Sequence, residues 1–87
     1  MSLAEVVMLD GKIYNINFRN RFYMASGTGT VEIYGAQAGS SVFEKLVTIT
    51  VSASSSGVAS ADEYPRIKGV VTSGAPVFSV SGTERAF

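Results

Sequence analysis

The 87-residue chain has no cysteine, no histidine and no tryptophan. Without cysteine there can be no disulfide scaffold, no thiolate metal site and no cysteine nucleophile. Without histidine the chain lacks the commonest general base and the commonest ligand of transition metals. These absences exclude the Ser-His-Asp and Cys-His arrangements of nucleophilic enzymes. We expect a protein that is not an enzyme and that uses no metal and no cofactor.

Charge is scarce as well. Charged residues make up 16% of the chain, and seven basic residues balance seven acidic ones. Zero net charge argues against a nucleic-acid-binding protein, which would carry a basic patch. Because 46% of the residues are hydrophobic, the composition also excludes a disordered chain.

Long apolar runs are missing too. No stretch approaches the 18 or so residues of a membrane-spanning helix, and residues 1–5 lack the basic start and apolar stretch of a signal peptide. We therefore expect no contact with a membrane and no Sec export.

The length predicts a single domain over residues 1–87. A chain of this size should have a folded surface of roughly 4,900 Å², which leaves room for one thin core. We therefore expect a homo-oligomer, for example a trimer, in which contacts between copies add stability.

Hydrophobic residues alternate with polar ones at period two, and the helical period is nearly absent. Residues 47–51 (Val-Thr-Ile-Thr-Val) are the clearest example, and residues 30–34 and 12–18 follow the same pattern. The alternation predicts that Glu32, Thr48 and Thr50 point outward. The residues predicted to point inward are Val31, Ile33, Val47, Ile49, Val51, Ile67 and Val71.

Turn signals separate these stretches. Asp10-Gly11 is a strong hairpin signal, Gly27-Thr28-Gly29 is predicted to be a hairpin turn, and residues 52–57 (Ser-Ala-Ser-Ser-Ser-Gly) a turn or exposed loop. The spacing predicts an all-β fold, a small antiparallel β-sandwich or barrel of seven to eight short strands. Residues 1–5 and 82–87 are interpreted as short terminal arms that reach a neighbour, or else as frayed ends.

Candidate reactive groups are few. The carboxylates of Asp10, Glu32, Glu44, Asp62 and Glu63 are all expected in solvated turns or on outward strand positions. Asp62-Glu63 lacks the alternating oxygen ligands of a calcium loop. Gly27-Thr28-Gly29 lies between two strands and not at a helix N-terminus, so it is not a phosphate loop.

The nearest approach to a nucleic-acid surface is a set of basic residues with aromatic neighbours. Solvated strand-face charges, which keep sheet edges from pairing, are the plainer interpretation. The set consists of Arg19, Arg21, Arg66 and Lys68, with Phe22, Tyr23 and Tyr64 beside them.

Aromatic residues supply the remaining candidates. Tyr14, Tyr34 and Tyr64 would form a sugar-stacking platform if they shared one surface, and would otherwise pack in the core or at a subunit contact. Together with Phe87 they are the predicted partner contacts.

Three stretches follow a pattern found in small virion proteins. They are residues 29–35 (Gly-Thr-Val-Glu-Ile-Tyr-Gly), 47–52 (Val-Thr-Ile-Thr-Val-Ser) and 64–73 (Tyr-Pro-Arg-Ile-Lys-Gly-Val-Val-Thr-Ser). With the strand that follows, this region resembles the small β-sandwich structural proteins of tailed bacteriophages. It departs from them at residues 36–39 (Ala-Gln-Ala-Gly), where the family often has Ser-Asn-Asp-Gly.

The resemblance implies a non-enzymatic virion structural protein, either a capsid decoration (cement) protein or a small head or tail accessory protein. Its partners would be further copies of itself and a major capsid or tail protein, in a virion assembled in the host cytoplasm. The alternative is a carbohydrate-binding or host-receptor-binding module, which the three tyrosines would serve.

Overall fold

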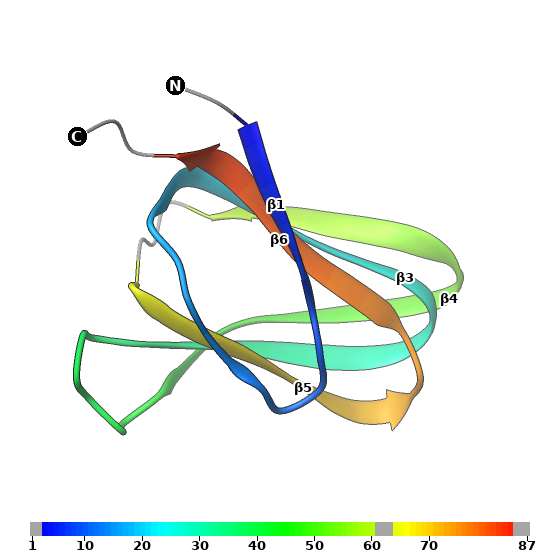
Figure 1. The fold of residues 1–87 in the computed structure, drawn as a ribbon. Helices are drawn as coiled ribbons and strands as arrows, with labels where there is room; N and C mark the ends of the chain where they lie inside the picture. Colours follow the sequence, from blue (N-terminus) through cyan, green and yellow to red (C-terminus); the bar gives the residue numbers. More distant parts are fainter. Residues whose placement is uncertain (1–2, 61–63, 85–87) are drawn as a thin grey trace.

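The computed structural model describes residues 3–60 and 64–84, and over these ranges it is built of β-strands (Figure 1). The strands are β1 (Leu3–Met8), β2 (Ile13–Asn15), β3 (Phe18–Ala36), β4 (Glu44–Ser60), β5 (Arg66–Gly74) and β6 (Val77–Glu84). They form one sheet in which every pair of neighbouring strands runs antiparallel. The protein is therefore all-β, with six antiparallel strands in a curled, half-barrel sheet.

The two longest strands, β3 and β4, lie side by side and bend back together (Figure 1). Along its other edge β3 pairs with β6 over residues 18–26 and with β5 over residues 29–36. β1 continues the sheet beyond β6, and β2 continues it beyond β5. The sheet thus consists of two half-sheets. The first half-sheet contains β1, β6, the part of β3 that pairs with β6 and the part of β4 beside it. The second half-sheet contains β2, β5, the part of β3 that pairs with β5 and the part of β4 beside that.

The chain changes direction each time it passes from one half-sheet to the other. We call the boundary between the half-sheets the crease. It runs through residues 10–11 between β1 and β2, residues 27–29 in β3, Ala53 in β4 and residues 74–76 between β5 and β6. Residues with a positive φ gather here: Gly11, Gly27, Gly29, Ala53 and Gly74. Glycine takes up such angles at little steric cost, so the chain can turn sharply without leaving the sheet.

Thr28 joins the strands at the crease. Its carbonyl oxygen accepts a hydrogen bond from the backbone N–H of Ala75 at 3.2 Å. Its hydroxyl oxygen accepts another from the backbone N–H of Ala53 at 2.9 Å. One residue of β3 is thereby bonded to β4 on one side and to the β5–β6 connection on the other.

The predicted count of seven to eight short strands is wrong for the described residues. The predicted hairpin turn at residues 27–29 is a bend within β3, because the chain keeps its pairing with β4 on both sides of it. The predicted turn at residues 52–57 lies within β4 for the same reason. Each supposed break is a bulge or a bend inside one long strand, which leaves fewer and longer strands.

Asp10-Gly11 does turn the chain, with Gly11 at φ 76°. The strands on either side of it do not form a hairpin, however. β1 pairs with β6 and β2 pairs with β5, so the turn carries the chain from one half-sheet to the other. A turn signal reports a local change of direction and does not say which strands will pair.

The core lies between the two half-sheets. The predicted inward residues Val31, Ile33, Ile49, Val51 and Ile67 are confirmed, each 4% exposed or less. The predicted Val47 and Val71 are partly buried and pack against this cluster. Outward positions are also confirmed, since Thr48 and Thr50 are exposed and Glu32 lies on the outer side of the second half-sheet. The first half-sheet contributes Met8, Phe18, Tyr23, Ala25, Phe78 and Val80 to the core.

We predict that Ile49→Ala lowers the free energy of unfolding by about 2–4 kcal/mol, because it removes buried methyl groups and leaves a cavity. The matched control is Thr48→Ala on the adjacent, exposed position, which should change stability by less than about 0.5 kcal/mol. Urea unfolding followed by circular dichroism measures both. Equal losses in the two variants would contradict the assignment of faces.

The close contacts at the crease lead to a second prediction, which concerns Gly29. At φ 145° a side chain is strained there, and a Cβ atom would also collide with the carbonyl oxygen of Ser73 and with Pro76. Gly39 has a φ of 76° but open space around it, so Gly39→Ala carries the backbone strain alone, about 1–2 kcal/mol. We expect Gly29→Ala to cost at least about 2 kcal/mol more than Gly39→Ala. Equal costs in thermal unfolding would show that the close approach at the crease does not matter.

Candidate functional site

The structure does not place the three candidate tyrosines on one surface. Tyr14 lies opposite Ile67 in the β2–β5 register and packs against the core. Tyr34 points to the outer side of the second half-sheet, since its neighbours on both sides in β3 are buried. Tyr64 lies on the inner side, with its ring against Gly35. The fourth candidate contact, Phe87, lies outside the described residues, as do residues 1–2 and 85–86 of the two predicted terminal arms. Residues 3–5 and 82–84 of those arms belong to β1 and β6.

Each tyrosine has a local polar partner. The Tyr14 hydroxyl accepts a hydrogen bond from the backbone N–H of Leu9 at 2.9 Å. The Tyr64 hydroxyl donates to the Glu44 carboxylate at 2.8 Å. These contacts connect neighbouring parts of the fold, so packing explains Tyr14 and Tyr64 better than a shared sugar-stacking platform does.

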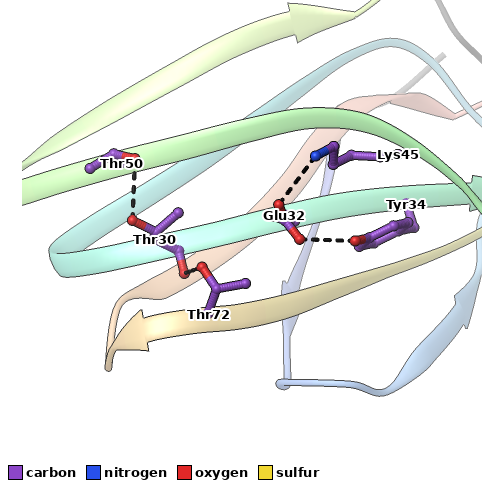
Figure 2. Close-up of polar contacts among 6 residues, drawn as sticks. All are labelled: Thr30, Glu32, Tyr34, Lys45, Thr50 and Thr72. Carbon is purple, nitrogen blue, oxygen red and sulfur yellow. Dashed lines mark hydrogen bonds and ion pairs between the residues drawn. The ribbon is translucent and has the colours of Figure 1, made fainter.

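The outer side of the second half-sheet is mostly polar. We define the polar face by Thr30, Glu32, Tyr34, Lys45, Thr48, Thr50, Lys68 and Thr72, and Val70, opposite Glu32, is an apolar residue on the same side. Figure 2 shows six of these side chains and the contacts among them. The Glu32 carboxylate accepts a hydrogen bond from the Tyr34 hydroxyl at 2.9 Å and lies 3.4 Å from the Lys45 ammonium. The hydroxyls of Thr30 and Thr50 lie 3.2 Å apart across β3 and β4. Several polar groups of this face therefore hydrogen-bond to one another.

The Tyr34–Glu32 hydrogen bond shifts the ionisation of both groups. It holds the pKa of the Glu32 carboxyl below its ordinary value, partial desolvation opposes this, and Lys45 adds to the lowering. The same hydrogen bond, with desolvation, raises the pKa of the Tyr34 hydroxyl. The pair favours a charged carboxylate and a neutral phenol.

The outer side of the first half-sheet is very different. One row of residues crosses its four strands, from Gly57 through Met24 and Ser79 to Val7. We define the apolar face by this row and its outward neighbours, which are Glu5, Phe22, Ser26, Ser55, Ala59, Val77 and Ser81. Glu5 carries the only formal charge in this set, and its carboxylate accepts a hydrogen bond from the Ser79 hydroxyl at 3.5 Å.

Large apolar side chains are exposed on this face. Val7 and Val77 are 60% and 61% exposed, and Phe22 and Met24 are each 38% exposed. The residues around them are small, and a Cβ atom at Gly57 would run into the ring of Phe22. The result is a sheet surface that exposes four large apolar side chains among small residues and carries one formal charge.

The apolar face continues into a groove at the crease, between the end of β1 and the β5–β6 connection. The groove has a volume of about 420 Å³, and its walls include Val7, Leu9, Val71, Pro76 and Val77. Asp10 is the only charged residue in its lining. The Asp10 carboxylate accepts a hydrogen bond from the backbone N–H of Val71 at 2.9 Å, which fixes one wall of the groove.

The basic residues do not form one patch either. Arg21 is 1% exposed, and its guanidinium donates to the carbonyl oxygens of Phe18 at 3.0 Å and Tyr64 at 2.5 Å. The prediction that Arg21 is a solvated strand-face charge is therefore wrong. Asn20, with φ 52°, lies in a bulge that shifts the register of β3 between Arg19 and Phe22. With this offset Arg21 faces inward and Phe22 outward.

Arg66 and Lys68 lie in β5 of the second half-sheet and contact the β3–β4 loop, residues 37–43. The Lys68 ammonium lies 4.5 Å from the centre of the Phe43 ring, and the Arg66 guanidinium lies 5.7 Å from it. Arg66 also donates a hydrogen bond to the carbonyl oxygen of Ser40. No sequence signal pointed to Phe43, because only the fold brings β5 beside this loop.

Conventional reactive sites are few in the described part of the chain. Residues 3–60 and 64–84 hold no group of three or more metal-binding side chains close enough to share an ion. Gly27-Thr28-Gly29, which the sequence analysis did not interpret as a phosphate loop, is part of the crease. Asp62 and Glu63 fall outside the described ranges. No helix in those ranges has the length and apolar character needed to cross a membrane.

Comparison with models of protein families, with curated proteins and with solved structures found no match. The arguments about function therefore start from the geometry of the sheet.

The Glu32–Tyr34 pair makes a prediction about pH. A carboxyl whose folded pKa is lowered stabilises the fold above its unfolded pKa, and this contribution disappears as the pH falls through the folded pKa. Tyr34→Phe should raise the pKa of Glu32. The free energy of unfolding should then fall less steeply as the pH is lowered. Carbon-13 NMR titration of the Glu32 carboxyl measures the shift. Thr72→Val, on the same face, is the control and should leave the titration of Glu32 unchanged.

Proposed function

We propose that this protein is a non-enzymatic structural subunit of a bacteriophage virion, where it serves as a capsid decoration (cement) protein or a small head or tail accessory protein. The observation that carries the proposal is the apolar face. A small protein that exposes four large apolar side chains on one nearly uncharged sheet surface would be stabilised by covering that surface with another protein.

The composition of the apolar face suits a protein partner. Serine, glycine and alanine between the large side chains let another backbone approach closely. The large side chains Phe22, Met24, Val7 and Val77 can serve as anchors, because apolar side chains that enter pockets of a partner carry most of the binding energy at an interface. Few charges would need to lose water when the surface is covered, so such a contact has a low desolvation cost.

The opposite polarity of the two half-sheets suits a subunit on the outside of a larger body. The apolar face would lie against the particle, and the polar face, with its threonines and the Glu32–Tyr34–Lys45 group, would face water. The sequence resemblance to small virion proteins of tailed bacteriophages supports the same assignment, because residues 29–35, 47–52 and 66–73 of the stretches that carry it lie in strands of the sheet.

The size of the chain favours several modest contacts per copy. Its accessible surface is 4866 Å², and a standard interface buries about 800 Å² per partner, which is roughly a sixth of that surface. One copy therefore has room for a contact with a major capsid or tail protein and for contacts with further copies. Stabilisation of the particle would be the sum of these contacts over many copies.

The apolar face can be tested with one charged substitution. Met24→Glu should weaken binding to particles that lack the protein by at least about tenfold, because it places a charge where an apolar side chain is to be buried. The matched control is Thr48→Glu on the polar face, which should bind like the wild type. Co-sedimentation with particles measures the binding, and circular dichroism checks that both variants are folded. Equal binding by the two variants would contradict the assignment of the docking face.

The role in the particle makes a further prediction. Particles lacking the protein should lose integrity at a lower temperature, and added protein should restore their resistance. Because few charges take part, restoration should be similar at low and high salt. Release of DNA on heating, followed by dye fluorescence, measures this. If particles without the protein are equally heat-stable but no longer adsorb to cells, the cement function is wrong and a receptor-binding module takes its place.

A further inference from the structure

β4 has a long free edge. Among the described residues it pairs with β3 alone, so the side of β4 that faces away from β3 has no strand beside it. Native proteins usually protect such an edge with charged residues or proline, or by keeping the edge strand short. β1 contains Glu5 and β2 has only three residues, whereas residues 46–60 of β4 contain neither a charge nor a proline. The edge of β4 is therefore open to pairing with a further strand.

One stretch of this edge has a regular backbone. Residues 47–51 pair with residues 29–33 of β3 without interruption, and the register between β3 and β4 shifts at either end of this stretch. An added strand needs evenly placed hydrogen-bonding groups, and bulges disrupt them. Residues 47–51 are thus the part of β4 in the second half-sheet that is suited to accept another strand.

The hydrogen-bonding groups of this free edge belong to Thr48 and Thr50. The carbonyl oxygen of Thr30 accepts a hydrogen bond from the Thr72 hydroxyl of β5 at 3.5 Å, so it points away from β4 (Figure 2). The N–H and C=O of one residue point to the same side of a strand, so Thr30 and Thr50 are a non-hydrogen-bonded pair of the β3–β4 ladder. The backbone groups of Thr50 therefore point to the free edge, and those of Thr48, two residues away, do the same.

The sequence of residues 47–51 reads the same in both directions, Val-Thr-Ile-Thr-Val. When two copies of it pair antiparallel about Ile49, Thr48 lies opposite Thr50 of the other copy on the outer side. On the inner side Val47 lies opposite Val51, and Ile49 lies opposite Ile49. Threonine pairs across strands are favourable, and no like charges meet in this register. The edge is therefore complementary to a second copy of itself.

We propose that two copies of the protein pair through their β4 edges over residues 47–51, antiparallel and about a two-fold axis at Ile49. In this register Thr48 of one copy and Thr50 of the other exchange both backbone hydrogen bonds, and the symmetry repeats the pair. The inner side chains of the two copies become neighbours, which extends the core of each copy across the edge. The inference goes beyond the proposed function, because its arguments come from β4 and not from the apolar face.

This contact leaves the apolar face uncovered. The two-fold axis stands perpendicular to the joined second half-sheets, so the polar faces of both copies lie on one side of the pair. The first half-sheets lie across the core from the second half-sheets, and in both copies they are therefore on the other side. A pair joined in this way presents two apolar faces in the same direction, where both can contact one particle.

A proline at the free edge tests the pairing. Thr50→Pro removes an N–H that points toward the second copy and removes no hydrogen bond to β3, so the monomer should still fold. It should weaken self-association by at least about tenfold, because the symmetry removes the hydrogen bond between copies twice. Thr50→Val is the matched control, since it also loses the hydroxyl contact with Thr30 but keeps the N–H.

Sedimentation velocity from 1 to 300 µM measures self-association of the wild type and both variants, and circular dichroism checks their folding. The wild type and Thr50→Val should form dimers at concentrations at which Thr50→Pro is monomeric. A wild type that stays monomeric over this range, or a folded Thr50→Pro that associates like Thr50→Val, would overturn the proposal.

Amide hydrogen exchange tests the interface without a substitution. The N–H groups of Thr48 and Thr50 should exchange rapidly at low concentration and become protected as the dimer forms. The N–H of Ile49, which faces β3, should be protected at every concentration. If Thr48 and Thr50 exchange equally fast in monomer and dimer, the copies associate elsewhere and the proposal is wrong.

Cysteine cross-linking tests the register, and the chain has no native cysteine. Hydrogen-bonded residues that lie opposite each other have Cα atoms about 5.5 Å apart, which a disulfide can span, whereas residues two positions out of register lie too far apart. A mixture of Thr48→Cys and Thr50→Cys proteins should therefore form a disulfide-linked dimer under mild oxidation, and each variant alone should stay monomeric on a non-reducing gel. Dimers from Thr48→Cys alone would show another register or a parallel pairing and would overturn the proposal.

Particle binding separates this inference from the proposed function. If the wild type stays monomeric in solution but binds particles, the β4 contact is wrong and the structural function stands. If the wild type forms the cross-linkable dimer but does not bind particles, the β4 contact stands and the virion function is wrong.

Discussion

The bend of β3 at residues 27–29 is the constraint on which the rest of the structure depends. β3 is the only described strand that pairs with three others, and it exchanges β6 for β5 as its partner at this bend. A straight strand would leave the sheet flat, with both sides in water. Folding the sheet at the crease brings the inward side chains of the two half-sheets together and creates the core. Glycines at positive φ and the bonds of Thr28 keep the backbone paired through the bend.

The same fold produces the contrast between the two outer sides. Each strand that crosses or adjoins the crease gives one set of side chains to the core and the other to a surface. In the second half-sheet that other set is mostly threonine, glutamate, tyrosine and lysine, several of which hydrogen-bond to one another. In the first half-sheet it is valine, methionine and phenylalanine separated by serine and glycine. An isolated monomer would leave these apolar side chains of the first half-sheet exposed to water. This supports the proposal that the apolar face is covered in a larger assembly.

Much of the candidate site could not be predicted from the sequence, and single residues show why. Arg21 was expected in solvent because arginine is usually exposed, yet the bulge at Asn20 turns it inward, where backbone carbonyl oxygens accept its hydrogen bonds. The same bulge turns Phe22 outward. Tyr14 and Tyr34 belong to clear alternating patterns, but no local rule relates the face of one strand to that of another strand that is not its neighbour. The groove at the crease combines residues from both ends of the chain.

The sequence by itself determined the class of fold and the inward residues of the regular strands. Alternation at period two is a local property of a strand that is buried on one side, so Val31, Ile33, Ile49 and Val51 could be assigned without a structure. The tertiary structure alone decided the number of strands, their partners and the position of each surface. Glycine permits a hairpin turn, a bulge or a bend with similar ease, and which of these forms depends on the hydrogen bonds that distant strands offer on either side of it. That dependence on distant partners made residues 27–29 a fold line within one strand and placed the loop and the groove at opposite ends of the second half-sheet.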